Sequence, residues 1–225
     1  FKNKTPFSKH LTSLIKYADF GISDVKSVPA NIPSDIWHQF KEQMKTQIGA
    51  DEGKLEEAFN IKNATQLQFT HTGEDSSSAG FGLDNESRGT VAALSFFSLA
   101  LRQLSRPTVT LIDEIDTSLH PALVAELVAL YTDPATNPHG SQLIFTTHDV
   151  SLINQSGSSN RLLQPDQIWL VEKDKDGASE LFPVTELGIR KEENIGKNYL
   201  NGVYGATPNP SFHTVFAQIM NGDDD

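Results

Sequence analysis

Residues 108–114 read Thr108-Val109-Thr110-Leu111-Ile112-Asp113-Glu114 and form the most informative segment of the chain. The first five residues make a short apolar, β-branched run, which is typical of a parallel strand covered on both faces. Two carboxylates follow without a break. Because ligands of open α/β sheets bind just beyond the carboxyl ends of the strands, this pair suits a Mg-nucleotide site, with Asp113 holding the metal or its water and Glu114 polarising the attacking water. The simpler alternative is an acidic pair that only ends a strand and caps the next helix.

A second strand is expected close to the first. Pro121 suits the first turn of a helix that continues from 122 to 131, and residues 142–146 form another short apolar run. Strand, helix and strand in this order are most simply a right-handed parallel crossover. His148 then lies at the same sheet edge as the acidic pair, where an imidazole can hydrogen-bond a terminal phosphate. A histidine that only caps the backbone is the alternative.

A third segment, Glu86-Ser87-Arg88-Gly89-Thr90, comes directly before a strongly apolar helix expected from Thr90 to Leu104. So apolar a helix should be buried on most faces. Ser87 can cap it, and Gly89 lets backbone approach closely. Free N–H groups and the helix dipole make an anion site there, although an ordinary helix cap is the more common use of such a segment.

Other patterns outline the rest of the chain. They predict an amphipathic start followed by a strand-like stretch to Val28, a helix at 34–48, strands at 64–72 and 81–83, a hairpin of 167–173 with 179–184, a tail at 189–205 that starts helical, and disorder at 221–225. We expect three parts: an N-terminal segment with a helical insertion (1–64), a nucleotide-binding lobe (65–206), and a partly disordered tail (207–225).

Composition excludes several classes of protein. The 225 residues contain 18 Lys+Arg and 29 Asp+Glu, a formal net charge of −11, which argues against broad contact with phosphate backbones. The absence of cysteine excludes disulfides and thiolate zinc sites. The sequence has no H-E-x-x-H, which disfavours a metal nuclease, and no G-x-S-x-G, which disfavours a serine hydrolase.

With no apolar run long enough to span a membrane, we expect a cytoplasmic protein. The start at Phe1 suggests processing or a piece of a longer chain.

Three segments in order carry a family resemblance: Glu86-Ser87-Arg88-Gly89-Thr90, then Leu111-Ile112-Asp113-Glu114-Ile115-Asp116-Thr117-Ser118-Leu119-His120-Pro121, then Phe145-Thr146-Thr147-His148-Asp149. Together they resemble the C-terminal half of an ABC-type ATPase head. They are similar to SMC heads and, more closely, to AAA-type ATP-binding proteins of bacterial abortive-infection and anti-phage systems. The resemblance runs from about Phe69 to Ala206. It implies an α/β fold of the P-loop NTPase type, mostly a parallel sheet with flanking helices, plus a C-terminal β-hairpin and helix.

The resemblance also implies roles for individual residues. Ser87, Arg88, Gly89 and Thr90 stand where the signature loop contacts the γ-phosphate bound by the opposite subunit. Asp113 would help to hold Mg²⁺, Glu114 would be the catalytic base, and His148 the switch histidine. Asp116 to His120 would be the D-loop, which crosses the dimer interface in that family. The implied ligands are therefore ATP and Mg²⁺.

Two residues depart from the family pattern, and one motif is missing. Arg88 replaces a usual glycine, and His120 replaces the usual aspartate of the D-loop. The sequence contains no G-x-x-x-x-G-K-[ST]; the nearest string, at 49–55, has the wrong spacing and lacks the hydroxyl. We therefore expect the phosphate-binding loop to lie upstream or in a separate chain.

The resemblance implies an ATPase that dimerises around ATP and controls a partner effector, a toxin or nuclease, in anti-phage defence. Two alternatives stay open: an ATP-binding scaffold or sensor with little turnover, and an SMC-type ATPase of nucleic-acid maintenance. Contact of the mildly basic tail with nucleic acid is possible, but a solvated helix face is the simpler interpretation.

Overall fold

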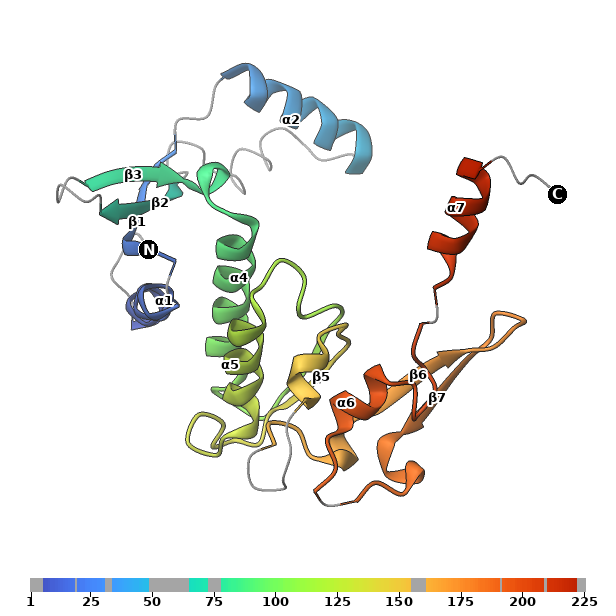
Figure 1. Cartoon of the computed structure of the whole chain (residues 1–225). Coiled ribbons are helices and arrows are strands. Elements are labelled where there is room, and N and C mark those ends of the chain that lie inside the picture. The colour runs from blue at the N-terminus through green and yellow to red at the C-terminus, as the bar shows by residue number, and fades with distance from the viewer. Residues whose placement is uncertain are drawn as a thin grey trace. The chain divides into compact units, whose positions relative to one another are not determined.

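The computed structural model describes residues 6–18, 20–30, 34–48, 65–72, 78–154, 161–190, 192–208 and 210–221. The chain forms two compact units, 1–106 with 117–119, and 107–116 with 120–225, each of which is described by itself. Figure 1 labels their helices and strands. The predicted boundaries at 64 and 206 stay predictions. The string at 49–55 and the end of the chain at 222–225 lie outside the described residues.

The first unit contains an antiparallel three-stranded sheet in the order β1-β2-β3. Its elements are α1 (Pro6–Tyr17), β1 (Ile22–Pro29), α2 (Ser34–Ile48), β2 (Thr65–Thr72), β3 (Ser78–Gly82) and α4 (Arg88–Gln103). The predicted strand at 64–72 and helix at 34–48 are confirmed, and the return strand begins three residues earlier than expected. Phe69 is fully buried in the central strand, opposite Val25 on one side and Phe81 on the other.

Helix α4 packs against α1 along one face. Its buried side chains recur at helical spacing: Thr90, Ala93, Leu94, Phe96, Phe97 and Ala100. Residues on the other side, such as Leu99 and Leu101, are half-buried, and Ser95 is exposed. Burial is therefore less complete than the apolar sequence predicts.

The second unit contains the predicted strand–helix–strand crossover. Strand β4 (Val109–Ile112) pairs in parallel with β5 (Gln142–Phe145), and α5 (Pro121–Thr132) lies between them in sequence. The α5 residues Val124, Leu127 and Val128 are almost fully buried. The α5 residue Tyr131 is also buried, and its hydroxyl lies 3.3 Å from that of Thr110, so α5 covers the face of the sheet that carries Thr110.

The opposite face of this sheet is open, which corrects the prediction of strands covered on both faces. Val109 is 57% exposed, Leu111 73% and Ile144 58%. Side chains alternate between the two faces of a strand, so these residues share the face that α5 does not cover. Sequence pattern identifies apolar strands, but it cannot say whether the same chain supplies both covering layers.

The C-terminal part of the second unit is a hairpin with short helices. Strands β6 (Trp169–Lys173) and β7 (Ser179–Pro183) pair antiparallel, as predicted. The segment after 189 does not start helical: α6 (Ile195–Leu200) begins only after Asn194, which caps it by accepting a hydrogen bond from Lys197 N at 2.9 Å. A small core holds these elements together: Ile168, Leu170, Val184, Ile195 and Tyr204.

The tail contains a helix, α7 (Phe212–Asn221), whose residues are all exposed. Asn221, expected to begin a disordered end, is the last residue of this helix. Among the described residues, no helix is both long and apolar enough to cross a membrane.

Replacing Leu127 with alanine tests the one-sided packing of the parallel pair. Leu127 is only 2% exposed. Its loss should lower the free energy of unfolding by about 2–5 kcal/mol, because the change leaves a cavity under α5. Leu111→Ala on the open face is the control, with a change within about 0.5 kcal/mol. Guanidinium denaturation measures both, and equal losses would contradict the packing described above.

Candidate nucleotide site

The ends of the two parallel strands bring the predicted residues together. Asp113 and Glu114 follow β4 directly, and His148 lies three residues beyond the end of β5. Backbone pairing continues past both strands, because Thr146 N donates to Ile112 O at 3.0 Å and Ile115 N donates to Thr146 O at 3.0 Å. The acidic pair and the histidine therefore share one edge of the sheet, as the sequence predicts.

Thr146 links the two strand ends through its side chain. Its hydroxyl donates to Asp113 Oδ1 at 2.5 Å and accepts a hydrogen bond from Glu114 N at 2.8 Å. A hydroxyl has one proton to donate, and the carboxylate can only accept, so the direction of both bonds is fixed. Thr146 therefore holds both the carboxylate of Asp113 and the backbone of Glu114.

Glu114 adopts a backbone conformation that is uncommon for its residue type. Its φ is +50°, in the left-handed region, where a side chain other than glycine is disfavoured. The hydrogen bond from Glu114 N to Thr146 holds the residue in this conformation. The resulting turn leaves Glu114 exposed at the sheet edge, the position that a water-activating base needs.

The next threonine, Thr147, makes a second connection between the same segments. Its hydroxyl donates to Asp116 Oδ1 at 2.6 Å and accepts from Asp149 N at 2.9 Å, while His148 N donates to the same Asp116 oxygen at 3.2 Å. Burial alone would raise the pKa of Asp116. The hydrogen bonds from Thr147 and from the backbone of Asp116 and His148, with the charge of the His148 ring, hold that pKa below its ordinary value. Asp116 therefore stays ionised and anchors the segment that carries His148.

The donor set at this edge fits Mg²⁺ with a bound triphosphate better than a metal held by protein alone. Oδ1 of Asp113 accepts the hydrogen bond from the Thr146 hydroxyl, whereas Oδ2 accepts no hydrogen bond from the described residues. Within those residues, no group of three or more His, Cys, Asp or Glu is placed to hold a metal ion. Mg²⁺ commonly takes one or two carboxylates and completes its shell with phosphate oxygens and water. Asp113 would be the carboxylate of such a site.

At the start of α4, Ser87 forms the predicted helix cap. Ser87 Oγ accepts from Thr90 N at 3.0 Å and lies 2.9 Å from Thr90 Oγ1. Thr90 is only 3% exposed, so its side chain belongs to the cap, while Arg88 is exposed. Arg88 and the first backbone N–H groups of the helix are the parts of this segment best suited to meet a phosphate.

Gly89 lies against the backbone of the loop that follows β4. A Cβ at Gly89 would come within 2.8 Å of the carbonyl oxygen of Ser118, which is closer than real Cβ atoms approach. Ser118 itself has φ +65°, in the left-handed region. The close backbone approach predicted for Gly89 is therefore present, but the neighbour is another loop of the same unit.

His120, the second departure from the family pattern, caps α5. Its Nδ1 accepts a hydrogen bond from Ala122 N at 3.2 Å. His120 therefore has a structural role at the start of α5. An aspartate at this position could cap the helix equally well.

Residues 1–154 match the model of a protein family described as "AAA domain, putative AbiEii toxin, Type IV TA system". The chain belongs to this AAA family. Membership implies a P-loop NTPase-like α/β fold and an ATP-binding ATPase domain, with which the parallel β4–β5 pair agrees. Among the described residues the other two sheets are antiparallel, so the expectation of a mostly parallel sheet is not met. No curated protein matches the chain.

The matched range of the AAA family differs from the range of our resemblance. It begins at residue 1 rather than near Phe69, and it ends at 154, before the β6–β7 hairpin. All eight candidate residues lie inside it: Ser87, Arg88, Gly89, Thr90, Asp113, Glu114, Asp116 and His148.

Thr146 and Thr147 were missed as site residues by sequence reasoning. Their only sequence signal was position, two hydroxyl side chains directly after an apolar strand. Such threonines are also common at strand ends that bind nothing, so the hydrogen bonds to Asp113 and Asp116 had to come from the structure.

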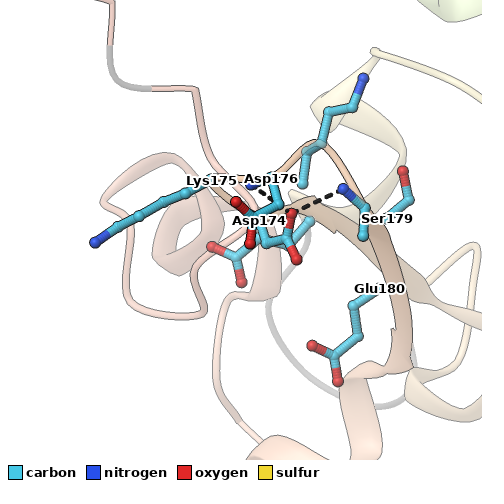
Figure 2. A pocket seen from close by; sticks show the side chains of 8 residues that line it. Asp174, Lys175, Asp176, Ser179 and Glu180 are labelled. Atoms are coloured by element: carbon cyan, nitrogen blue, oxygen red, sulfur yellow. Dashed lines mark hydrogen bonds between the residues drawn. The ribbon is translucent and has the colours of Figure 1, made fainter.

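A hollow at the tip of the β6–β7 hairpin gives no competing site. It is lined by Glu172–Asp176 and Ala178–Glu180 (Figure 2). The carboxylate of Asp174 accepts from Asp176 N at 2.9 Å and from Ala178 N at 2.7 Å, so it stabilises the turn of the hairpin.

Replacing Thr146 with valine should loosen the link between the strand ends. Valine keeps the shape but loses both hydrogen bonds, so the free energy of unfolding should fall by about 1 kcal/mol for this exposed position. Amide hydrogen exchange at Glu114 should also become faster. Thr146→Ser, which keeps the hydroxyl, is the matched control. Equal exchange rates at Glu114 in both variants would show that the hydroxyl does not hold this backbone.

The ionised state of Asp116 predicts a defined pH dependence of stability. Because its folded-state pKa lies below the ordinary 3.8, the carboxylate stabilises the folded chain above that pH, and this contribution disappears as pH falls through the lower folded value. The stability advantage of the unmodified chain over Asp116→Asn should therefore shrink on acidification below pH 3.8. NMR titration of the Asp116 carboxyl, with denaturation at several pH values, measures this. A pKa at or above 3.8 would contradict the assignment.

Proposed function

We propose that this chain is one half of an ABC-type ATPase head that dimerises around ATP and, through hydrolysis, controls a partner effector. The single observation that supports this most strongly is the meeting of two acids and a histidine at one sheet edge in a chain of the AAA family. Either an acidic pair or a lone histidine is common by itself. Their convergence at neighbouring strand ends is what a triphosphate site requires.

Each residue then has a task. When bound, MgATP supplies the terminal phosphoryl group that is transferred to water. Asp113 would hold the metal through a carboxylate oxygen, and Thr146 fixes the orientation of that carboxylate. Glu114 accepts the proton of the attacking water, and the His148 ring donates a hydrogen bond to the terminal phosphate. Asp116 holds the His148 backbone in place.

The phosphate-binding loop is supplied by a second half of the head. The sequence contains no G-x-x-x-x-G-K-[ST], so the chain alone lacks the cradle for the other phosphates. The open face of the β4–β5 sheet, with Val109, Leu111 and Ile144 exposed, supports such a partner. Parallel sheets are ordinarily covered on both faces, and exposed apolar surface of this kind marks an interface.

The family description, which names a putative toxin of a toxin–antitoxin system, supports the proposed role in defence against phage through abortive infection. Within this role the effector would be a toxin or nuclease. Two alternatives are retained: a scaffold or sensor with little turnover, and an SMC-type ATPase acting on nucleic acid. The presence of both Glu114 and His148 favours hydrolysis over binding without turnover.

Replacing Glu114 with glutamine tests the assignment. In the assembled head, made of this chain and its phosphate-loop half, Glu114→Gln should lower the rate of ATP hydrolysis by about 10²-fold or more, because glutamine cannot accept the proton. ATP-dependent dimers should persist, since the nucleotide contacts remain. Phosphate release and light scattering measure the two properties.

Glu126→Gln, an equivalent change at an exposed position of α5, is the matched control and should leave both properties unchanged. Normal hydrolysis by Glu114→Gln would mean that another residue is the base. Negligible hydrolysis by the unmodified head, with intact dimers, would favour the scaffold.

A further inference from the structure

A histidine of the central strand contacts the residue that precedes the α4 cap. Nε2 of His71 lies 2.8 Å from Oε1 of Glu86. The Glu86 side chain is only 5% exposed, and that of His71 is 30% exposed. His71 also packs edge-on against Phe81 of the neighbouring strand, with ring centroids 5.3 Å apart. The histidine is therefore fixed by the sheet, and the glutamate is fixed by the histidine.

This contact is a strong constraint because the carboxylate is buried. A carboxylate has only acceptor atoms, so Nε2 of His71 carries the proton and donates. A buried charge without a partner is costly, and the carboxylate would leave its place if the donor were removed. Glu86 is also held through its backbone, since its N–H donates to Leu83 O at 3.2 Å.

The position held in this way is the start of the predicted signature loop. Glu86 directly precedes Ser87, whose hydroxyl caps α4 through Thr90 N. Displacing Glu86 would displace the cap, and with it Arg88 and the first N–H groups of the helix. Those are the groups best placed to meet a phosphate, so their direction depends on His71.

We propose that His71 is a positioning residue for the loop Ser87–Thr90: through Glu86 it sets the geometry with which this loop meets the terminal phosphate of ATP held by the opposite subunit. The inference rests on the proposed function, because only a dimer formed around ATP brings such a phosphate to the loop. In this role His71 acts only through Glu86 and is not a catalytic residue.

Three variants of the assembled head test this role: His71→Ala, His71→Gln and His10→Ala. His71→Ala should lower the rate of hydrolysis and the affinity of the ATP-dependent dimer by about tenfold to a hundredfold, as expected for misplacement of a contacting group. ATP binding by undimerised heads should stay within about twofold, since the loop serves the opposite subunit. His71→Gln should restore most activity, because its amide can donate to Glu86. His10→Ala, at an exposed position of α1, should change nothing.

Amide exchange at Thr90 provides a readout that does not require turnover. His71→Ala should speed exchange of this cap amide by about tenfold, with little change at β1. Normal dimers and normal exchange in His71→Ala would overturn the positioning role and leave the proposed function intact. If His71→Ala lowers stability, ATP binding and dimer formation equally, and His71→Gln does not restore them, His71 has only a structural role. If the unmodified head forms no ATP-dependent dimer, the proposed function fails and the role of His71 fails with it.

Discussion

The hydrogen bonds of Thr146 are the constraint on which the candidate site depends. Thr146 follows β5, and its hydroxyl is hydrogen-bonded to the carboxylate of Asp113 and to the backbone of Glu114, which follow β4. These two hydrogen bonds join the ends of the two strands. Without this link, Glu114 would relax from its left-handed conformation, because isolated residues of its type disfavour it. A hydrogen bond from the Thr147 hydroxyl to Asp116 joins the same two segments one residue further along the chain. The histidine and the acids are therefore held by adjacent threonines.

In the second unit, one face of the parallel β4–β5 pair is packed and the other face is open. Helix α5 covers one face of the parallel pair, while Leu111 and Ile144 on the other face are exposed. Apolar surface of this kind is stabilising only when something covers it. The second half of the head that we propose would supply the phosphate-binding loop missing from the sequence and would also cover the open sheet face.

Much of this could be predicted from local patterns, and the rest depended on contacts distant in sequence. The strand before Asp113 and the cap at Ser87 follow from short-range chemistry, apolar β-branched runs and hydroxyl caps, which a sequence displays directly. The pairing of His71 with Glu86 joins a strand to a loop 15 residues away, and no local pattern signals it. The helical start expected at 189 failed because α6 begins only after the cap at Asn194. Exposure of the sheet face could not be predicted, since burial depends on which elements arrive from elsewhere.

The meeting of Gly89 with the carbonyl of Ser118 has an evolutionary consequence. A methyl group at the glycine has no room unless the opposing loop retreats, and that loop is already held in a left-handed turn. Because the opposing atom belongs to the backbone, no change of side chain at 118 relieves the contact, and related sequences should keep glycine at position 89.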